Sequence, residues 1–304
     1  MQVSIIIVNY NTKELIKNCI NSIYKYTQDI QYEIIVSDNG STDGSIEMLK
    51  SEFPNVILIE NNANLGFGTA NNRGLKIAKG KYIFYLNSDT VLLNNAVKIF
   101  YDYWENSSDK ENIGALGCNL LKDNYDYNFS YGKFGSFYGF LKELIKLKLH
   151  ITNESIKKCL LKKDFKDLQI SKKEKYIGNV DYISGAALFV KNNEIARFDE
   201  KIFLYFEEVD LQYSMYKQNL SRILIDGPEI IHYSRGSSQK ILKDVLYLKS
   251  FSQINQVLSK FYYYKKNICN NIQIEILKQL QISIWKNKFL YDETKSFIIN
   301  LKKI

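Results

Sequence analysis

Acidic residues of this chain occur at two places where their spacing suits metal or acid–base chemistry. At the first, Asp89 follows the apolar run 82–86 directly, after Asn87 and Ser88. In an open α/β sheet, ligands bind beyond the carboxyl ends of the strands, so a carboxylate at this position faces a crevice. Mg²⁺ and Mn²⁺ take oxygen ligands, and one or two from the protein suffice when waters and phosphates complete the shell. Asp89 is therefore a candidate metal ligand, and capping of the following helix is the alternative.

The second acidic cluster is Glu207, Glu208 and Asp210, three acids within four positions. Apolar and aromatic residues flank the cluster, so at least one carboxylate is expected beside low-dielectric walls. Burial and a neighbouring like charge both raise the pKa of a carboxyl group, which is how a general base is tuned. The alternative is a helix N-terminus, where acids are favoured by the helix dipole.

The elements that position the first cluster alternate between strand and helix patterns. Strands are expected at 3–8, 32–36, 56–60 and 82–86, and amphipathic helices at 15–24, 45–53 and 69–78. Four strands joined by helical crossovers predict an α/β fold with a mostly parallel sheet and right-handed connections.

Each of these four strands ends in a cluster of polar residues. The clusters begin at Asn9, Asp38, Asn61 and Asn87. Loops need such residues in any case, but four successive clusters at one edge of one sheet predict a polar cleft. Within them, Thr12 and Asp43 are the expected caps of the helices that follow.

A glycine-containing segment, Gly66-Phe67-Gly68-Thr69-Ala70-Asn71, follows the third strand. It is not the dinucleotide fingerprint G-x-G-x-x-G, because its last position is Asn and the first βα turn contains no glycine. The glycines instead permit a tight turn with a close backbone approach, and the helix start behind them can face a phosphate.

Taken together, four segments resemble the nucleotide-sugar half of family-2 glycosyltransferases. They are SIIIVNYN at 4–11, DNGSTDGS at 38–45, NLGFGTANNRG at 64–74 and LNSDT at 86–90. The nearest subgroup is the bacterial rhamnosyltransferase-like one. The resemblance implies a GT-A fold, in which a nucleotide-sugar-binding sheet flanked by helices continues into an acceptor region, here with a C-terminal helical extension. The family motif Asp-x-Asp is Asn87-Ser88-Asp89 in this chain, and Asn at its first position also occurs in that subgroup.

The resemblance also implies roles for individual residues. Asp38 would bind the base, Tyr10 would lie near the nucleoside, and Asp89 would bind a divalent metal ion, Mg²⁺ or Mn²⁺. The other residues expected to contact the nucleotide sugar are Asn9, Asn11, Asn39, Gly66, Phe67, Asn71, Asn87, Ser88, Gly185 and Arg235.

The second half of the site is expected after residue 176. Small residues around Gly185 match a Ser/Thr-Gly-Ala run that lies beside the donor sugar in the family. The family pattern aromatic-x-Glu-Asp-x-Asp has Glu208 in place of its Asp, so Glu208 is the expected catalytic base, with Asp210 as the second choice. His232 begins a segment similar to the family's His-x-x-Gly-x-Ser, in which His joins the metal or diphosphate shell; Gly236 comes one position late.

The charge of the chain is uneven. The net charge is +8, and residues 133–175 contain 12 lysines and 5 acids while residues 241–304 contain 11 lysines and 4 acids. The motif-bearing remainder is therefore acidic, which argues against nucleic acid as the partner. The basic segments suit an anionic membrane surface or a lipid phosphate, with a solvated lysine-rich face as the alternative.

Cysteine usage and hydropathy indicate a reducing compartment. The four cysteines are far apart in sequence, no basic signal-peptide region precedes the first strand, and no apolar run is long enough to span a membrane. We therefore expect a cytoplasmic protein that can attach peripherally to the inner face of the cell membrane.

The sequence is expected to divide into a glycosyltransferase domain and a basic helical region. The glycosyltransferase domain is predicted over 1–240, with 1–120 as the nucleotide-sugar half, 122–175 as an aromatic and lysine-rich insertion, and 176–240 as the acceptor and catalytic half. A basic helical region follows over 241–304, and it could pack on the core, contact a membrane or form a homodimer face.

The sequence thus predicts an inverting glycosyltransferase that uses a nucleotide-sugar donor, dTDP-rhamnose or a UDP-sugar. The expected acceptor is a hydroxyl of a surface polysaccharide or lipid-linked glycan. The rivals are a nucleotidyltransferase acting on sugar phosphates, which would need a second carboxylate near Asp89, and a non-enzymatic basic module that binds membrane or nucleic acid.

Overall fold

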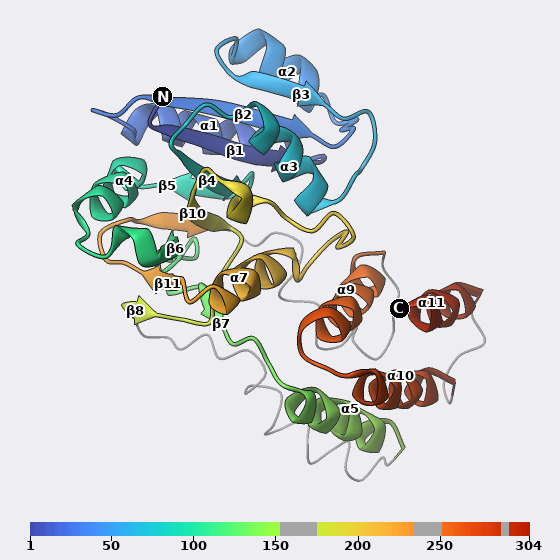
Figure 1. Ribbon diagram of the computed structural model, residues 1–304. Coiled ribbons are helices and arrows are strands. Elements are labelled where there is room, and N and C mark those ends of the chain that lie inside the picture. The colour runs from blue at the N-terminus through green and yellow to red at the C-terminus, as the bar shows by residue number, and fades with distance from the viewer. Residues whose placement is uncertain (153–174, 234–250, 287–291) are drawn as a thin grey trace. The chain divides into compact units, whose positions relative to one another are not determined.

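The computed structural model describes residues 1–152, 175–233, 251–286 and 292–304 (Figure 1). These residues form two compact units. The first comprises the described parts of 1–133, 171–203 and 207–235, and the second those of 134–170, 204–206 and 236–304. The domain boundaries expected from the sequence, at residues 122, 176 and 240, stay a prediction.

The first unit is built on a sheet that has eight strands among the described residues, in the order β3-β2-β1-β4-β10-β6-β11-β8 (Figure 1). The strands are β1 (Val3–Asn9), β2 (Tyr32–Asp38), β3 (Ile57–Glu60), β4 (Tyr82–Asn87), β6 (Ile113–Gly117), β8 (Gly178–Asn179), β10 (Ala187–Lys191) and β11 (Ser221–Leu224). Strands β3, β2, β1 and β4 are parallel, and β10 runs antiparallel to both β4 and β6. The expected mostly parallel α/β sheet is confirmed.

Helices cover both faces of this sheet. They are α1 (Lys13–Tyr26), α2 (Ser45–Glu52), α3 (Phe67–Ile77), α4 (Ala96–Asn106) and α7 (Glu207–Lys217), with 3-10 turns at Lys110–Asn112 and Glu194–Ala196. Alternate strand residues point to opposite faces, so Ile5 and Ile7 pack with residues of α1, α2 and α4, whereas Ile6 packs in a separate core with residues of α3 and α7. The continuous apolar sequence of β1 and β4 follows from this burial on both sides.

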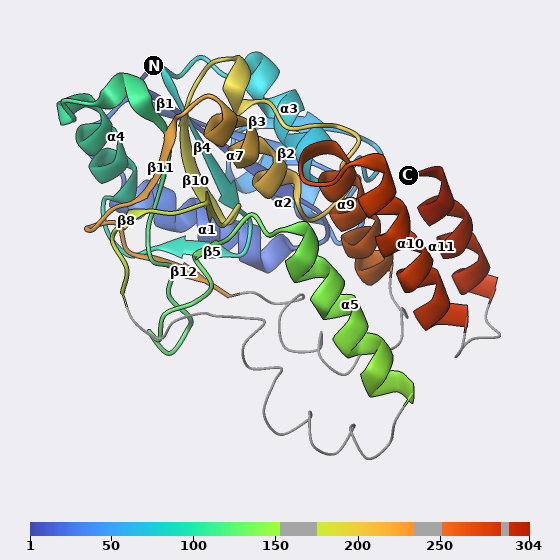
Figure 2. The same cartoon turned by 60° about the horizontal axis from the view of Figure 1, so that its bottom comes forward.

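Two short strand pairs lie outside the main sheet. Strand β5 (Thr90–Leu92) pairs antiparallel with β12 (Ile230–His232), beside α1 (Figure 2). Strand β7 (Tyr131–Gly132) pairs antiparallel with β9 (Tyr182–Ile183). Neither β5 nor β7 has an alternating pattern long enough to be predicted.

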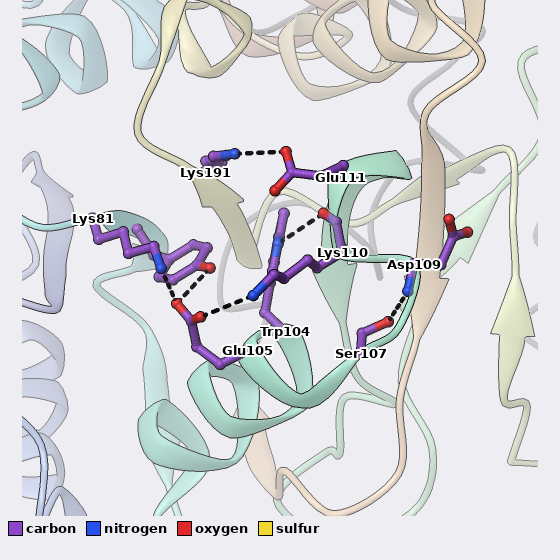
Figure 3. Close-up of polar contacts among 9 residues, drawn as sticks. Lys81, Trp104, Glu105, Ser107, Asp109, Lys110, Glu111 and Lys191 are labelled. Carbon is purple, nitrogen blue, oxygen red and sulfur yellow. Dashed lines mark hydrogen bonds and ion pairs between the residues drawn. The ribbon is translucent and has the colours of Figure 1, made fainter.

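Ion pairs and a hydrogen bond connect α4 to the start of β4, at the end of that strand away from the polar loops (Figure 3). Glu105 of α4 accepts hydrogen bonds from Lys81 and from the Tyr82 hydroxyl, and Lys110 lies 3.7 Å from its other oxygen. The hydrogen bond with Lys81 lowers the pKa of Glu105. These groups are paired with one another and fasten α4 to the start of β4.

The second unit consists of helices in the described residues. They are α5 (Phe137–Thr152), α9 (Phe251–Asn267), α10 (Asn271–Lys286) and α11 (Asp292–Lys303). Phe140 of α5 packs against Phe261 and Tyr264 of α9, with ring centroids 5.1 and 4.7 Å apart. Lys260 of α9 lies 2.6 Å from Glu143 of α5. The C-terminal helical extension is thus present, and α5 packs with it. None of the described helices is both long and apolar enough to cross a membrane.

Candidate active site at the carboxyl edge of the sheet

The parallel register brings the polar strand ends together. Asn9 is the partner of Asp38 across β1 and β2, and Val8 is the partner of Asn87 across β1 and β4. Glu60 is the partner of Asp38 across β2 and β3, and Asn61 donates to Ser37 and Asn39. All four predicted clusters therefore meet at one edge of the sheet, as the parallel topology requires. The cleft expected at this edge stays a prediction.

Asp38 is fully buried and organises the loop that follows β2. Its Oδ1 accepts hydrogen bonds from the backbone N–H groups of Gly40 (3.0 Å) and Ser41 (2.8 Å). Its Oδ2 accepts one from Asn9 Nδ2 at 2.7 Å, and the side chain has no exposed surface. The carboxylate thus fixes the shape of the loop, while its predicted contact with a base stays a prediction.

The loop after β1 is joined to its neighbours by hydroxyl and amide groups. The Thr12 hydroxyl lies 2.6 Å from Asn9 Oδ1 and 2.9 Å from Ser88 Oγ. Thr12 therefore bridges two loops and does not cap α1 with its side chain. Asp43 supplies the cap, because its Oδ2 accepts from the Lys13 N–H at 2.8 Å; its Oδ1 also accepts from Ser45 N–H at the start of α2.

Other predicted ligands of the nucleotide lie around this loop. Asn11 Oδ1 accepts from the Thr42 N–H at 2.8 Å, and Asn39 Nδ2 donates to the Gly66 carbonyl at 3.1 Å. Tyr10 is 47% exposed, so its ring is accessible from solvent. Exposed aromatic surface at a strand end is available for a nucleoside, which agrees with the role predicted for Tyr10.

The N-terminus of α3 holds a protein segment. The Phe67 N–H donates to the Phe203 carbonyl at 2.9 Å, and a Cβ added to Gly66 would lie 2.2 Å from the same oxygen. Asn72 exchanges two hydrogen bonds, each 2.9 Å long, with the backbone of Phe198. The first amide of this helix is therefore engaged by Phe203, and the predicted contact of the helix start with a phosphate stays a prediction.

Asn71 is also buried, and its Nδ2 donates to the Phe67 carbonyl within α3 at 3.1 Å. Phe67 packs edge-on against Phe198. In the structure, Gly66, Phe67 and Asn71 thus hold the helix and the segment that leads toward α7. Their contacts with a nucleotide sugar stay a prediction.

Asp89 and His232, the two predicted metal ligands, lie side by side. His232 Nε2 is 3.2 Å from Asp89 Oδ1, and the side chains are 15% and 18% exposed. The antiparallel pairing of β5 with β12 places them, because it aligns His232 with Thr90, and the Tyr233 N–H donates to the Asp89 carbonyl at 3.0 Å. The sequence predicted this proximity only through the resemblance.

Asn87, two residues before Asp89, has an unsatisfied oxygen. Its Oδ1 is buried and has no hydrogen-bond partner among the described residues. An orphaned acceptor of this kind is costly unless a ligand or water satisfies it. Within the described ranges no group of three or more His, Cys, Asp or Glu side chains could hold a metal ion. Asp89, His232 and Asn87 are nevertheless ligand types that Mg²⁺ or Mn²⁺ accepts in a shell completed by water and phosphate.

Glu208 lies over Gly185, which comes just before β10. A Cβ on Gly185 would lie 3.3 Å from Glu208 Cβ and 3.8 Å from its carboxyl carbon. The next residue, Ala186, accepts a hydrogen bond from the Asn87 N–H at 3.0 Å. Because β10 is antiparallel to β4, its beginning lies at the edge where β4 ends. Glu208 is therefore connected to the Asn87–Asp89 turn through two consecutive residues.

The first turn of α7 carries two acids with raised pKa values. Burial raises the pKa of Glu208 to about 7. Glu207 is only 5% exposed, and burial, followed by the charge of Glu208, raises its pKa well above the usual range. Glu207 Oε2 has no hydrogen-bond partner among the described residues. At neutral pH Glu208 can thus exchange a proton, as a general base must.

The backbone before these acids is unusual. Tyr205 and Phe206 both have positive φ angles, 65° and 69°. Two consecutive non-glycine residues in the left-handed region cost free energy, and such residues cluster at functional sites. Asp210 is 5% exposed in the same helical turn. Arg235 lies outside the described residues.

The sequence reasoning missed two contributors to the site. Thr12 was interpreted only as a cap, although it bridges to Ser88. Gln212 was not considered, although it is completely buried at the position one turn after Glu208. The available signal was the spacing, because Gln212 lies four positions after Glu208 and so on the same helix face.

A mostly parallel sheet of this strand order, with an antiparallel strand beside β4, polar loops at its carboxyl edge and helices on both faces, is the sheet of the GT-A class of glycosyltransferases. Over residues 4–165 the chain matches the family described as Glycosyl transferase family 2. This match covers more than half of the chain, and the protein belongs to that family.

Individual relatives agree with this assignment. The chain is 39% identical over 121 residues to the poly(ribitol-phosphate) beta-glucosyltransferase of Bacillus spizizenii, a match that covers 38% of this chain and 19% of that enzyme. It is 27% identical over 275 residues to the uncharacterized glycosyltransferase YfnE of Bacillus subtilis, covering 81% of this chain and 68% of YfnE. It is 25% identical over 223 residues to the N-acetylglucosaminyl-diphospho-decaprenol L-rhamnosyltransferase of Mycobacterium tuberculosis, covering 67% of each.

Solved structures show the same fold. The mannosyltransferase PcManGT of Pyrobaculum calidifontis, in complex with GDP-Man and Mn²⁺, aligns with a TM-score of 0.52 at 14% identity, covering 99% of this chain and 84% of that one. S. aureus TarS aligns with a TM-score of 0.51 at 14% identity, covering 98% of this chain and 45% of TarS. The chain thus spans less than half of TarS and about a fifth of the B. spizizenii enzyme.

Proposed function

We propose that this glycosyltransferase works with inversion, and that Glu208 is its general base. The Glu208 carboxylate takes the proton of an acceptor hydroxyl, and the hydroxyl oxygen forms a bond to the anomeric carbon of the donor sugar. The bond from that carbon to the nucleoside diphosphate breaks on the opposite side, and the diphosphate leaves with the electron pair. A single displacement of this kind inverts the anomeric centre.

The observation that carries this proposal is the position of Glu208 over Gly185. Gly185 has no side chain, which leaves room for the Glu208 side chain beside the start of β10, and the following residue is bonded to Asn87. The pKa of about 7 leaves a large fraction of Glu208 ionised at neutral pH and still basic. This position beside Gly185 and the Asn87 turn favours Glu208 over the second choice, Asp210.

Asn87, Asp89 and His232 are the residues that would hold a divalent cation. When bound, such a cation would neutralise the negative charge that develops on the departing diphosphate. The orphaned Asn87 Oδ1 supports this assignment, as does the presence of Mn²⁺ in the PcManGT complex. The chain's own contribution is to hold Asp89 and His232 together through the β5–β12 pair.

Binding of the donor in the presence of metal is the direct test. In a thermal-shift panel of dTDP-rhamnose, UDP-glucose, UDP-N-acetylglucosamine and GDP-mannose, we expect one donor to raise the Tm, and to do so more strongly with Mn²⁺. A ligand at one hundred times its Kd stabilises a protein by about 2.7 kcal/mol, which is easily measured.

The matched variant for this test is Asp89→Asn, which keeps the shape of the side chain and removes its charge. We expect it to lose the Mn²⁺-dependent part of the shift. If no donor changes the Tm with or without Mn²⁺, the proposed chemistry is wrong and only the family and fold remain.

The acceptor we propose is a hydroxyl of a lipid-linked or surface glycan. Two relatives carry names that specify a diphosphate-linked polyprenol acceptor, and one carries a name that specifies poly(ribitol-phosphate). A synthetic N-acetylglucosaminyl diphosphate with a short lipid chain and a ribitol-phosphate oligomer are therefore the two acceptors to compare. Release of nucleoside diphosphate reports turnover with either one.

We also propose that the second unit attaches to an anionic membrane surface on the cytoplasmic side. Helix α5 exposes Tyr138 (76%), Ile145 (43%) and Leu149 (49%), and Lys142 and Lys146 are exposed on the same helix. Apolar side chains alongside lysines are typical of helices that lie in the membrane interface. A homodimer through this helix is the competing use of the same residues.

Sedimentation with vesicles distinguishes the two. We expect the protein to pellet with phosphatidylglycerol vesicles and not with phosphatidylcholine vesicles, and less at high salt, because screening weakens the attraction of lysines to anionic lipid. The double variant Ile145→Asp/Leu149→Asp should remain in the supernatant. Equal pelleting with anionic and zwitterionic vesicles would contradict the proposal. A concentration-dependent dimer that these substitutions disrupt would favour the homodimer through α5.

A further inference from the structure

Gln212 lies one helical turn after Glu208 and joins α7 to strand β9. Its Nε2 donates to the Ile183 carbonyl at 2.7 Å, and its Oε1 accepts from the Ile183 N–H at 2.7 Å. The side chain is completely buried. One amide side chain thus satisfies both backbone groups of a single strand residue, in the manner of a neighbouring strand.

The same amide also contacts Glu208. Gln212 Nε2 lies 3.1 Å from the Glu208 carbonyl oxygen, the acceptor four positions earlier in the helix. Residues i and i+4 lie on the same face of a helix, so the face that carries Gln212 also carries Glu208. Ile183 is two residues before Gly185, over which Glu208 lies. The Gln212–Ile183 pair and the Glu208–Gly185 contact are therefore two adjacent points of one helix–strand interface.

The Gln212–Ile183 pair is held by hydrogen bonds, and the Glu208–Gly185 contact is a packing contact. The Glu208 atoms nearest to an added Gly185 Cβ are carbons, whereas Gln212 makes two short hydrogen bonds to Ile183 and is completely buried. Hydrogen bonds are strongly directional, and leaving either buried Ile183 group unsatisfied would be costly. These observations favour Gln212 as the residue that fixes α7 against β9.

We propose that Gln212 is a positioning residue for the Glu208 base: its paired hydrogen bonds to Ile183 fix the height and rotation of α7 over Gly185. The inference rests on the proposed role of Glu208. Gln212 contacts no substrate in this account, and it acts on the reaction only through the placement of the Glu208 carboxylate.

Gln212→Met tests this, because methionine has a similar length and volume and no amide. We expect kcat to fall by about 10–100-fold, since a misplacement of about 1 Å can reduce a rate roughly 10²-fold. The Kd of the donor, taken as dTDP-rhamnose or UDP-glucose according to which one is turned over, should stay within about twofold. A loss in kcat with retained donor binding is what a misplaced base produces.

Met215→Ala is the matched control. Met215 is completely buried on the same helix and forms no part of the Ile183 pair. Its truncation should lower the Tm, because it leaves a cavity in the core. Below that Tm, kcat should remain near that of the wild type. A merely structural role of Gln212 would make the two variants behave alike.

Gln212→Asn is the second variant, chosen because it keeps the amide and so is expected to fold. Its amide is one methylene shorter, by about 1.5 Å, so pairing with Ile183 requires α7 to shift. We expect a reduced kcat here too, with donor binding retained. Wild-type turnover with an unchanged kcat in either folded variant would overturn the inference, whereas absence of turnover in the wild type would instead refute the proposed function.

Discussion

Glu208→Gln should lower kcat by about 10²–10⁴-fold, the range that a general base contributes. Glutamine has nearly the same shape and can pack over Gly185 in the same way, but it cannot take a proton from an acceptor hydroxyl. The Kd of the nucleotide sugar should change little, because the carboxylate acts on the acceptor. Steady-state kinetics of diphosphate release, together with calorimetric binding of the donor, measure both quantities.

The pH dependence of kcat in the wild type also tests whether Glu208 is the base. Burial raises the pKa of Glu208 to about 7, so kcat should fall as pH decreases through about 7, where the base becomes protonated. For an unshifted glutamate this loss would begin near its ordinary value of 4.5. An acid limb that persists unchanged in Glu208→Gln would assign the titration to another group.

Glu208→Asp is the informative companion, because aspartate is the usual residue at this position of the family pattern. It retains a carboxylate but withdraws it by one methylene. We expect activity between that of the wild type and that of Glu208→Gln, with a more acidic pH limb. If Asp210→Asn rather than Glu208→Gln abolished turnover, the base would be Asp210.

Among substitutions that add a single methyl group, Gly66→Ala should be the most destabilising. Gly66 has φ 83° and ψ 173°, a region that essentially only glycine occupies. The new Cβ would lie 2.2 Å from the Phe203 carbonyl oxygen, which already accepts from the Phe67 N–H. We expect a loss of roughly 2–4 kcal/mol, seen as a decrease of about 4–16 °C in Tm.

The control for this substitution is Gly139→Ala on α5. Gly139 is exposed and helical, and among the described residues an added Cβ would approach the Ser136 hydroxyl oxygen at 3.2 Å. Alanine is the better helix former by about 1 kcal/mol, so this variant should be neutral or slightly stabilised. Equal Tm values for Gly66→Ala and the wild type would show that α3 and Phe203 do not approach as closely as the structure has them.

The sheet and its polar edge could be predicted from sequence because both follow from local patterns. Continuous apolar runs gave the strands near Val3 and Tyr82, helical periodicity gave the crossovers, and parallel topology then put Asn9, Asp38 and Asn87 at one edge. These inferences need only the sequence near each element and a general rule about parallel sheets.

The partners of those residues could not be predicted in the same way, because they depend on contacts between segments far apart in the chain. The approach of His232 to Asp89 requires pairing of two three-residue strands, which have no recognisable period. The glycines at the start of α3 were interpreted as permitting a close backbone approach, and the group that approaches Gly66 is the Phe203 carbonyl. A close approach can be inferred from glycine, but the approaching group cannot.

The direction of β10 has a consequence for how relatives can diverge. Strand β6 ends at Gly117 on the catalytic edge, and β10 begins there at Ala187, since the two strands are antiparallel. The intervening stretch therefore departs from and returns to the same side of the sheet. The part of it between β7 and β8 can vary in length between enzymes without altering the register of β6 or β10, whereas Ile183 and Gly185 near its end belong to the site. Chimaeras that exchange only this part would test whether it takes part in acceptor choice.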